Sequence, residues 1–388
     1  MLLERYYDGV EIHRADKIIY VRFLCPHRVI STCHSSAGGI RDDLEYLYNH
    51  QSCEPQGHWL SDQIHRLAIH HPDAYRELIA TRHGLPADRC ATLGTAASMH
   101  MAGMAHERFR DLEVVAIVTA GVETNAGRAG DPAAYHEEDG RYILAPHAGT
   151  IVIMLCINRE LRSGALIEAV TLATEAKTAV LQELSVPSCY SDGLATGTGT
   201  DQIAIAARLD GAPLTGAGKH TRLGELIARG VQAALRQALA RQNGLSPAAQ
   251  CSTLALLRRL GAREETFSAA ICAGLNDDDG QLLTRNLQVV LNDPPAVAAV
   301  AALLHLRDQF LWDVLPRSCL PDVFASYAAQ LAAAVSGRPQ RLPAYREILA
   351  HPPPALTPAA TLDLIARAFA LGFSEKWADQ YGQNRVSP

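Results

Sequence analysis

The pattern of hydrophobic and polar positions along the chain changes near residue 244. Before that point, β-branched and other apolar residues form short runs bounded by Gly, Asp or Pro, which predicts β-strands. The runs are GVEIHRADKIIYVRF (9–23), HRVISTC (27–33), CATLGTA (90–96), EVVAIVTAG (113–121), GTIVIMLCI (149–157) and QIAIAARL (202–209). Two helices are predicted among them, over about residues 62–81 and residues 164–184. Adjacent strands with few helices favour a mixed β-sheet over a regularly alternating α/β fold.

After this point the chain is rich in Ala and Leu, with the period of an α-helix. Asn243-Gly244 resembles a helix end, and Ser246-Pro247 resembles a helix cap followed by proline at the first helical position. The helical runs are STLALLRRL (252–260), VAAVAALLHLRDQFLWDVL (297–315), DVFASYAAQLAAAVSG (322–337) and TPAATLDLIARAFALGF (357–373). We therefore predict an α+β fold: a mixed-sheet domain with packed helices over residues 1–243 and an all-α domain over residues 244–388. Packing or homo-oligomerisation is the expected role of the second domain.

Composition narrows the classes of partner. The 388 residues are 48% hydrophobic and 20% charged, with a formal net charge of −6, so a nucleic-acid partner is not expected. The longest apolar runs are shorter than the ~20 residues that a membrane-spanning helix needs. The N-terminal residues carry charges that a secretory signal lacks, and the nine cysteines are scattered singly, as in a reducing compartment. We expect a cytoplasmic protein without a membrane partner.

The stretch SDGLATGTGTDQIAIAARL (191–209) alternates threonine and glycine before a strand. It lacks the lysine of a phosphate-binding P-loop, the third glycine of a dinucleotide fingerprint is replaced by Gln202, and the loop precedes its strand. Glycines leave room for a ligand beside the backbone, threonine hydroxyls can bond it, and a carboxylate can act as base, ligand or acceptor. The candidates are Thr196, Gly197, Thr198, Gly199, Thr200 and Asp201. The alternative is a strand-entry turn in which Asp201 bonds local amides.

Lys177 falls in the middle of the apolar face of the helix predicted over residues 164–184. A lysine there either extends to the surface or is buried with a partner. The helix alone favours extension to the surface, and a nearby carboxylate such as Asp201 would reverse that preference. Glu175 projects to the opposite side of the helix.

Two further loops carry polar side chains beside predicted strands. TAGVETNAGRAGDPAAY (119–135) contains Glu123, Asn125 and Asp131, although its composition also suits an ordinary exposed turn. STCHSSAGG (31–39) contains Ser35 and Ser36 without the Gly-x-Ser-x-Gly elbow of many hydrolases.

Metal ligation has weak support in the sequence. His147 precedes a strand and could be an acid, a ligand or a surface histidine. No His-Glu-x-x-His motif occurs, and a composite metal site from distant loops stays open. We predict neither a metal nor a cofactor.

Four segments in order resemble the adenosylcobinamide amidohydrolase family of corrinoid salvage, over about residues 20–215. They are VISTCHSSAGGI, IVTAGVETNAGRAGDPA, AGTIVIMLCINRELRSGALIEAVTLATEAKTAVLQEL and SDGLATGTGTDQIAIA. The resemblance implies hydrolysis of the amide that joins aminopropanol to a propionate side chain of the corrin ring, releasing adenosylcobyric acid. The Asp-x-His-x-x-Gly motif is absent, so the corrinoid is expected to bind as substrate without a protein histidine on cobalt.

On this resemblance, we expect Asp201 to orient or deprotonate water and Lys177 to stabilise the oxyanion or protonate the amine. Glu175 accompanies Lys177 in the motif and is the third catalytic candidate. The expected substrate-binding residues are Ser35, Ser36, Glu123, Asn125, Asp131 and residues 196–200. A second mechanism has Ser36 or a loop threonine as a covalent nucleophile with Lys177 as its base. A corrinoid-binding protein without catalysis, or hydrolysis of an unrelated amide, would use the same residues.

Overall fold

The computed structural model describes residues 1–52, 61–133, 136–139, 141–143, 149–351 and 355–376. The chain divides into two compact units, Met1–Leu245 and Ser246–Pro388. The first contains mixed β-sheets and helices, and the second is helical, which confirms the predicted α+β class.

A six-stranded sheet forms the centre of the first unit. Its strand order is β5 (Gly39–Arg41), β4 (His27–Ser31), β15 (Gln202–Arg208), β13 (Ile151–Ile157), β9 (Leu112–Ala120) and β8 (Gly103–Phe109). Strand β13 pairs in parallel with β15 and antiparallel with β9, and all seven of its residues are buried. Continuous apolar strands of this kind are typical of a sheet that is covered on both faces.

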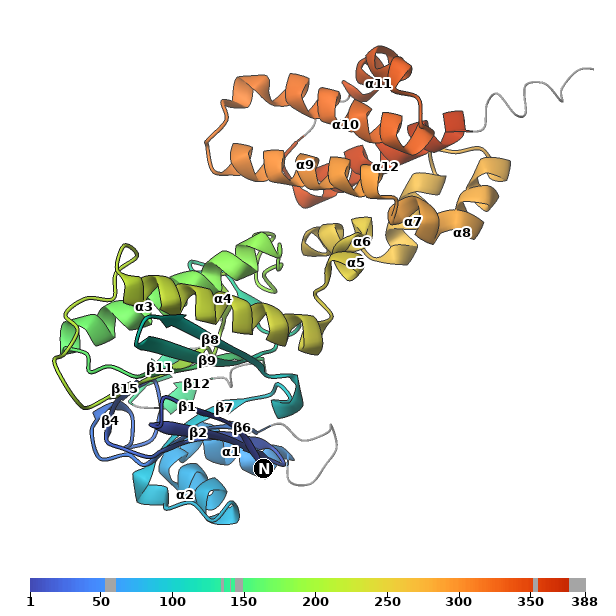
Figure 1. The fold of residues 1–388 in the computed structure, drawn as a ribbon. Helices are drawn as coiled ribbons and strands as arrows, with labels where there is room; N and C mark the ends of the chain where they lie inside the picture. The colour runs from blue at the N-terminus through green and yellow to red at the C-terminus, as the bar shows by residue number, and fades with distance from the viewer. Residues whose placement is uncertain (53–60, 134–135, 140, 144–148, 352–354, 377–388) are drawn as a thin grey trace, which may run out of the picture. The chain divides into compact units, whose positions relative to one another are not determined.

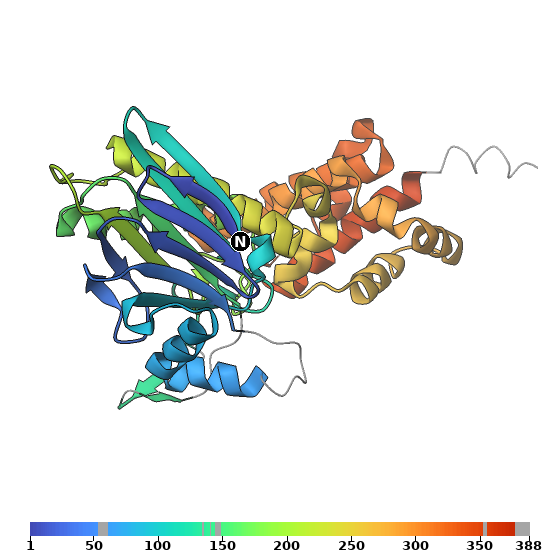
Figure 2. The same cartoon turned by 60° about the horizontal axis from the view of Figure 1, so that its bottom comes forward.

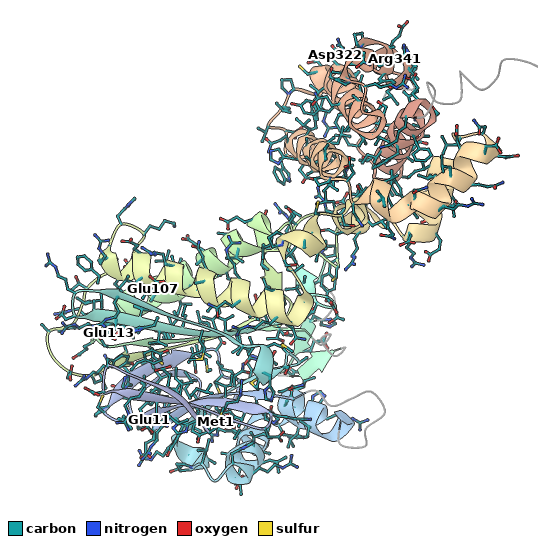
Figure 3. The ribbon with its side chains drawn as sticks, turned by 45° about the vertical axis from the view of Figure 1, so that its right-hand side comes forward. Met1, Glu11, Glu107, Glu113, Asp322 and Arg341 are labelled. Atoms are coloured by element: carbon teal, nitrogen blue, oxygen red, sulfur yellow. The ribbon has the colours of Figure 1, made fainter. Side chains whose placement is uncertain are left out.

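Helices α3 (Ser163–Glu183) and α4 (Arg222–Asn243) cover one face of this sheet (Figure 1). Because side chains alternate along a strand, Ile153 and Leu155 of β13 pack toward the helices, whereas Val152 and Met154 pack on the other face. At the sheet edge, Glu107 of β8 pairs with Arg229 of α4 at 3.4 Å; Figure 3 labels Glu107 on its strand.

A five-stranded sheet packs against the other face of the six-stranded sheet. Its order is β1 (Leu2–Tyr6), β2 (Val10–Ala15), β3 (Ile18–Phe23), β6 (Tyr46–Gln51) and β7 (Cys90–Thr95). Its outer face is covered by α1 (Ser61–His70) and α2 (Pro72–Arg82), so the first unit has four layers, helix, sheet, sheet and helix (Figures 1 and 2). Two short ladders lie outside the large sheets: β10 (Ala126–Gly127) with β14 (Gly197–Thr198), and β11 (His136–Glu138) with β12 (Arg141–Ile143).

Several predicted elements differ from the observed ones. The single run over residues 9–23 is a hairpin whose turn includes Asp16 in the left-handed region, at a φ of 43°. The helix predicted over residues 62–81 is interrupted, because Pro72 begins a second helix and cannot continue the hydrogen bonding of the first. Helix α4 was not predicted.

The second unit is built from helices around an apolar core that includes Phe310, Phe324 and Phe369. The helices are α5 (Pro247–Gln250), α6 (Thr253–Leu257), α7 (Glu264–Cys272), α8 (Asp277–Leu291), α9 (Pro294–Leu311), α10 (Leu320–Ser336), α11 (Leu342–Leu349) and α12 (Pro358–Lys376). Arg341, labelled in Figure 3, forms an ion pair with Glu375 at 2.6 Å. Across the described ranges, no single helix has the length and apolar character needed to cross a membrane; α8 and α9, bent by 75°, meet those two criteria only as a pair.

Candidate functional site

A cavity of about 850 Å³ lies in the first unit, beside the short ladder of β10 and β14. Helix α3, the glycine-threonine loop and the segment after β10 supply its lining. The lining residues are Asn125, Gly127, Arg128, Ala129, Asp131, Pro132, Ala133, Thr174, Lys177, Thr178, Tyr190, Thr196, Gly197, Thr198, Gly199 and Asp201. The structure thus brings together residues that lie up to 76 positions apart in the sequence, from Asn125 to Asp201.

An ion pair between Lys177 and Asp201 forms part of the cavity wall. Lys177 comes from the buried face of α3 and is only 8% exposed, and its Nζ contacts Oδ2 of Asp201, the residue before β15. The lysine therefore does not extend to the surface, because a carboxylate meets it inside the fold. A buried ammonium without such a partner would carry a large desolvation cost.

The other oxygen of Asp201 is held by two donors. Its Oδ1 accepts hydrogen bonds from the hydroxyl of Thr198 at 2.6 Å and from the main-chain NH of Ile151 at 3.1 Å. Gly197 leaves the space that this arrangement needs, since a Cβ there would lie 2.3 Å from Oδ2 of Asp201 and 2.9 Å from Nζ of Lys177. The carboxylate is therefore fixed from the loop, the central strand and the helix.

Asn125 holds the loop from behind. Its Nδ2 donates to the main-chain oxygen of Gly149 at 2.8 Å and to Oγ1 of Thr200 at 3.2 Å, while its Oδ1 accepts from the hydroxyl of Tyr190 at 2.6 Å. A Cβ at Gly199 would lie 2.8 Å from that Oδ1, so this glycine also permits a close approach. These bonds engage the Asn125 amide in shaping the loop.

Asp131 lines the cavity at the segment after β10. Its Oδ2 accepts hydrogen bonds from the hydroxyl of Ser188 at 2.5 Å and from the main-chain NH of Arg128 at 2.8 Å. Burial opposes ionisation of Asp131, but hydrogen bonds from Ser188, Ser191 and Arg128 outweigh it and lower the pKa of this carboxyl. The guanidinium of Arg128 donates to the main-chain oxygen of Leu194 at 3.2 Å, which ties this segment to the loop.

The serine candidates lie outside the residues that line the cavity. The buried Ser35 hydroxyl lies 3.0 Å from the Sγ of Cys33. Ser36 is exposed, and its hydroxyl donates to Oδ1 of Asp73 in α2 at 2.6 Å. Both serines therefore face structural partners in the layers away from α3.

Glu123, Glu175 and Thr200 also lie outside that lining. Glu123 is exposed, and Glu175 forms an exposed ion pair with Lys219 on the outer side of α3. The side chain of Thr200 is not part of the cavity lining, and its hydroxyl donates to the main-chain oxygen of Gly149 at 2.8 Å.

Sequence reasoning missed several side chains of the lining: Arg128, Ala129, Pro132, Ala133, Thr174, Thr178 and Tyr190. Thr174 lies three residues before Lys177 and four before Thr178, so each pair is adjacent on the helix surface and helical periodicity could have identified both threonines. Tyr190 has no comparable signal in the sequence, because its place depends on how the chain folds back onto Asn125.

Among the residues that the structure describes, no group of three or more His, Cys, Asp or Glu side chains could hold a metal ion. His147 lies outside the described residues.

Comparison with known proteins identifies the family. The sequence model of the adenosylcobinamide amidohydrolase family matches residues 3–247, and the chain belongs to that family. An uncharacterised protein of Methanocaldococcus jannaschii is 33% identical over 237 residues, which cover 58% of this chain and 87% of that protein. The family match includes every residue of the cavity lining and ends close to the boundary between the two units.

Proposed function

We propose that this chain hydrolyses the amide between aminopropanol and a propionate side chain of adenosylcobinamide, giving adenosylcobyric acid for re-use in corrinoid salvage. Membership of the family supports the reaction class. The single observation that supports this cavity as its site is the Lys177–Asp201 pair, in which a carboxylate and an ammonium lie side by side in the cavity wall.

Enzymatic hydrolysis of an amide requires three catalytic functions, and Lys177 and Asp201 can supply them. The nucleophile must lose a proton, the tetrahedral oxyanion must be stabilised, and the leaving amine must be protonated. In the proposal, Asp201 takes the proton of the nucleophile and later returns it to the amine nitrogen. Lys177 places its positive charge beside the oxyanion, at a site where partial burial strengthens the attraction.

The cavity suits the amide-bearing arm of a larger molecule. Its volume of about 850 Å³ is in the range that holds a drug-sized group, whereas an adenosylated corrinoid is larger. We propose that the arm enters the cavity while much of the corrin ring stays outside. Ala129, Pro132 and Ala133 supply apolar lining for the methyl-bearing edge of the ring.

A reducing cytoplasmic setting fits this proposal. The eight cysteines that the structure describes are all free thiols, as expected where disulfides do not form.

The variant Asp201→Asn tests the assignment of the base. It keeps the side-chain shape but lowers basicity, so kcat is expected to fall by about 100- to 10,000-fold, with corrinoid binding retained. The matched control is Asp210→Asn. Asp210 lies beyond the other end of β15, and its exposed carboxylate pairs with Arg208. Turnover by Asp201→Asn within about 10-fold of the unsubstituted enzyme would contradict the role of Asp201.

The same assay separates catalysis from binding alone. An enzyme releases aminopropanol and adenosylcobyric acid in equal amounts. A corrinoid carrier would return all of the adenosylcobinamide intact, which is the outcome expected if the cavity binds the ligand without cleaving it.

A further inference from the structure

The hydroxyl of Thr198 donates to a carboxylate, unlike three other hydroxyls of the cavity lining. Thr174 and Thr178 donate to main-chain carbonyl oxygens at 2.9 Å, and Tyr190 donates to the side-chain oxygen of an asparagine. The hydroxyl of Thr198 instead donates to the carboxylate of Asp201, at 2.6 Å. A hydroxyl bonded to a base, and facing a cavity, has the arrangement that activates a nucleophile.

We propose that Thr198 is the nucleophile of this site and forms an ester with the acyl group of the substrate. The proposal rests on the proposed function for the identity of the substrate, and on the geometry of Thr198, Asp201 and Lys177 for the chemistry. It replaces the water that the sequence led us to expect in the first step. It also selects among the serine and threonine candidates, because Ser36 is bonded to Asp73 outside the cavity lining.

The contacts of Asp201 favour the hydroxyl over water as the proton donor. A carboxylate oxygen has two lone pairs, and those of Oδ1 accept from Thr198 and from the main-chain NH of Ile151. The other oxygen is in contact with Lys177. The hydroxyl proton that this carboxylate already accepts therefore belongs to Thr198, and the lysine balances the charge that moves during its transfer.

The chemistry of the first half-reaction is balanced within the three side chains and the substrate. The Oγ of Thr198 forms a bond to the amide carbon as its proton passes to Asp201, and the oxyanion lies beside the ammonium of Lys177. The bond between carbon and nitrogen then breaks, and the amine nitrogen takes the proton from Asp201. Aminopropanol leaves, and Thr198 carries the corrinoid acid as an ester.

The second half-reaction repeats these steps with water. Water adds to the ester carbon and gives a proton to Asp201. The ester bond to Oγ breaks, and Thr198 recovers its proton from Asp201. Adenosylcobyric acid is released, one water molecule is consumed, and all three side chains return to their starting states.

Two small flanking residues give Thr198 access to a substrate carbonyl. Gly197 and Gly199 present no side chain on either side of it, and a Cβ at either position would collide with the site itself. The pairing of Thr198 with Ala126 across the β10–β14 ladder fixes the backbone that carries the hydroxyl.

The test uses the full chain and two probes. The enzyme is mixed with adenosylcobinamide or with p-nitrophenyl acetate, quenched in acid and digested, and the mass of the peptide that contains Thr198 is measured. We expect an ester on Thr198 with each probe. Thr198→Val should lose the ester and at least about 1,000-fold in kcat, whereas Thr198→Ser should keep the ester and measurable turnover.

The matched control is Thr171→Val, which removes an exposed hydroxyl of α3 that donates to a main-chain oxygen. It should behave as the unsubstituted enzyme with both probes. Hydrolysis by folded Thr198→Val within about 10-fold of that enzyme would overturn the proposal. So would the absence of an ester on Thr198 with both probes, whatever the variants do.

The two probes also separate this proposal from the proposed function. An acetyl ester on Thr198 without conversion of adenosylcobinamide would leave the nucleophile in place and overturn the substrate. Conversion of adenosylcobinamide by Thr198→Val would keep the substrate and overturn the nucleophile.

Discussion

The substitution Gly197→Ala adds one methyl group at the Lys177–Asp201 pair without removing any polar atom. The added Cβ would lie 2.3 Å from Oδ2 of Asp201, whereas ordinary contacts begin at 3.4 Å. The backbone of Gly197 is outside the left-handed region, so alanine fits the main chain and only the side chains must move. Because the clash must be relieved, we expect the carboxylate of Asp201 to shift by about 1 Å and to lose its alignment with the three donors that hold it.

A displacement of about 1 Å at a reacting group is enough to reduce the rate by about 100-fold, equivalent to about 2.7 kcal/mol in the activation free energy. The loss should appear in kcat more than in KM, because the cavity keeps its other lining. The melting temperature should fall as well, because displacing the buried carboxylate strains its pair with Lys177, and this loss exceeds the roughly 0.4–1 kcal/mol that the methyl contributes by restricting the unfolded chain.

The assay compares kcat for adenosylcobinamide hydrolysis and the melting temperature of Gly197→Ala with those of Gly218→Ala. A Cβ at Gly218 meets nothing within 4 Å, so that variant should keep its turnover within about twofold. If Gly197→Ala retained turnover within about threefold while staying folded, the argument that the Lys177–Asp201 geometry limits the reaction would be refuted.

Three further variants probe other parts of the account. Glu175→Gln should keep kcat within about twofold and change the free energy of unfolding by less than about 1 kcal/mol, because the exposed pair with Lys219 lies away from the cavity. A large loss of kcat would show that Glu175 takes part in catalysis. Tyr190→Phe removes the hydrogen bond to Asn125 and should lower the free energy of unfolding by about 0.5–1.5 kcal/mol, measured by denaturant titration. An unchanged value would argue against a stabilising role of this hydrogen bond. Burial lowers the pKa of His50 from 6.5 to about 3, so the unfolded chain binds this proton more readily than the folded chain between those values. Stability should therefore rise with pH across that window and fall on acidification by up to about 1.4 kcal/mol per pH unit, and His50→Gln should flatten the dependence of the melting temperature on pH.

The sequence predicted the central strands because they are buried on both faces. In β13 and β15 nearly every position is apolar, so these strands can be recognised in the sequence without knowing which layers cover the sheet. Helix α4 was missed although its buried face carries Leu223, Ile227, Val231 and Leu235, which recur every four residues. That periodicity, together with the helix end recognised at Asn243-Gly244, could have identified it.

Part of the cavity lining could be predicted from the sequence, but its arrangement could not. Lys177 and Asp201 were both identified, yet their pairing depends on how α3 packs over the start of β15. Ser31, at the end of β4, pairs with Ala204 near that same start, so the loop containing Ser36 begins at the correct end of the sheet. The loop then turns toward α2, and only the tertiary structure reveals that direction.

The central claim is that the family cavity of this chain cleaves the aminopropanol amide of adenosylcobinamide. The most direct test incubates the purified protein with adenosylcobinamide, with and without a chelator, and separates the corrinoids by chromatography and mass spectrometry. We expect adenosylcobyric acid and aminopropanol in equal amounts, at the same rate with and without the chelator. Recovery of all the adenosylcobinamide intact would contradict the account.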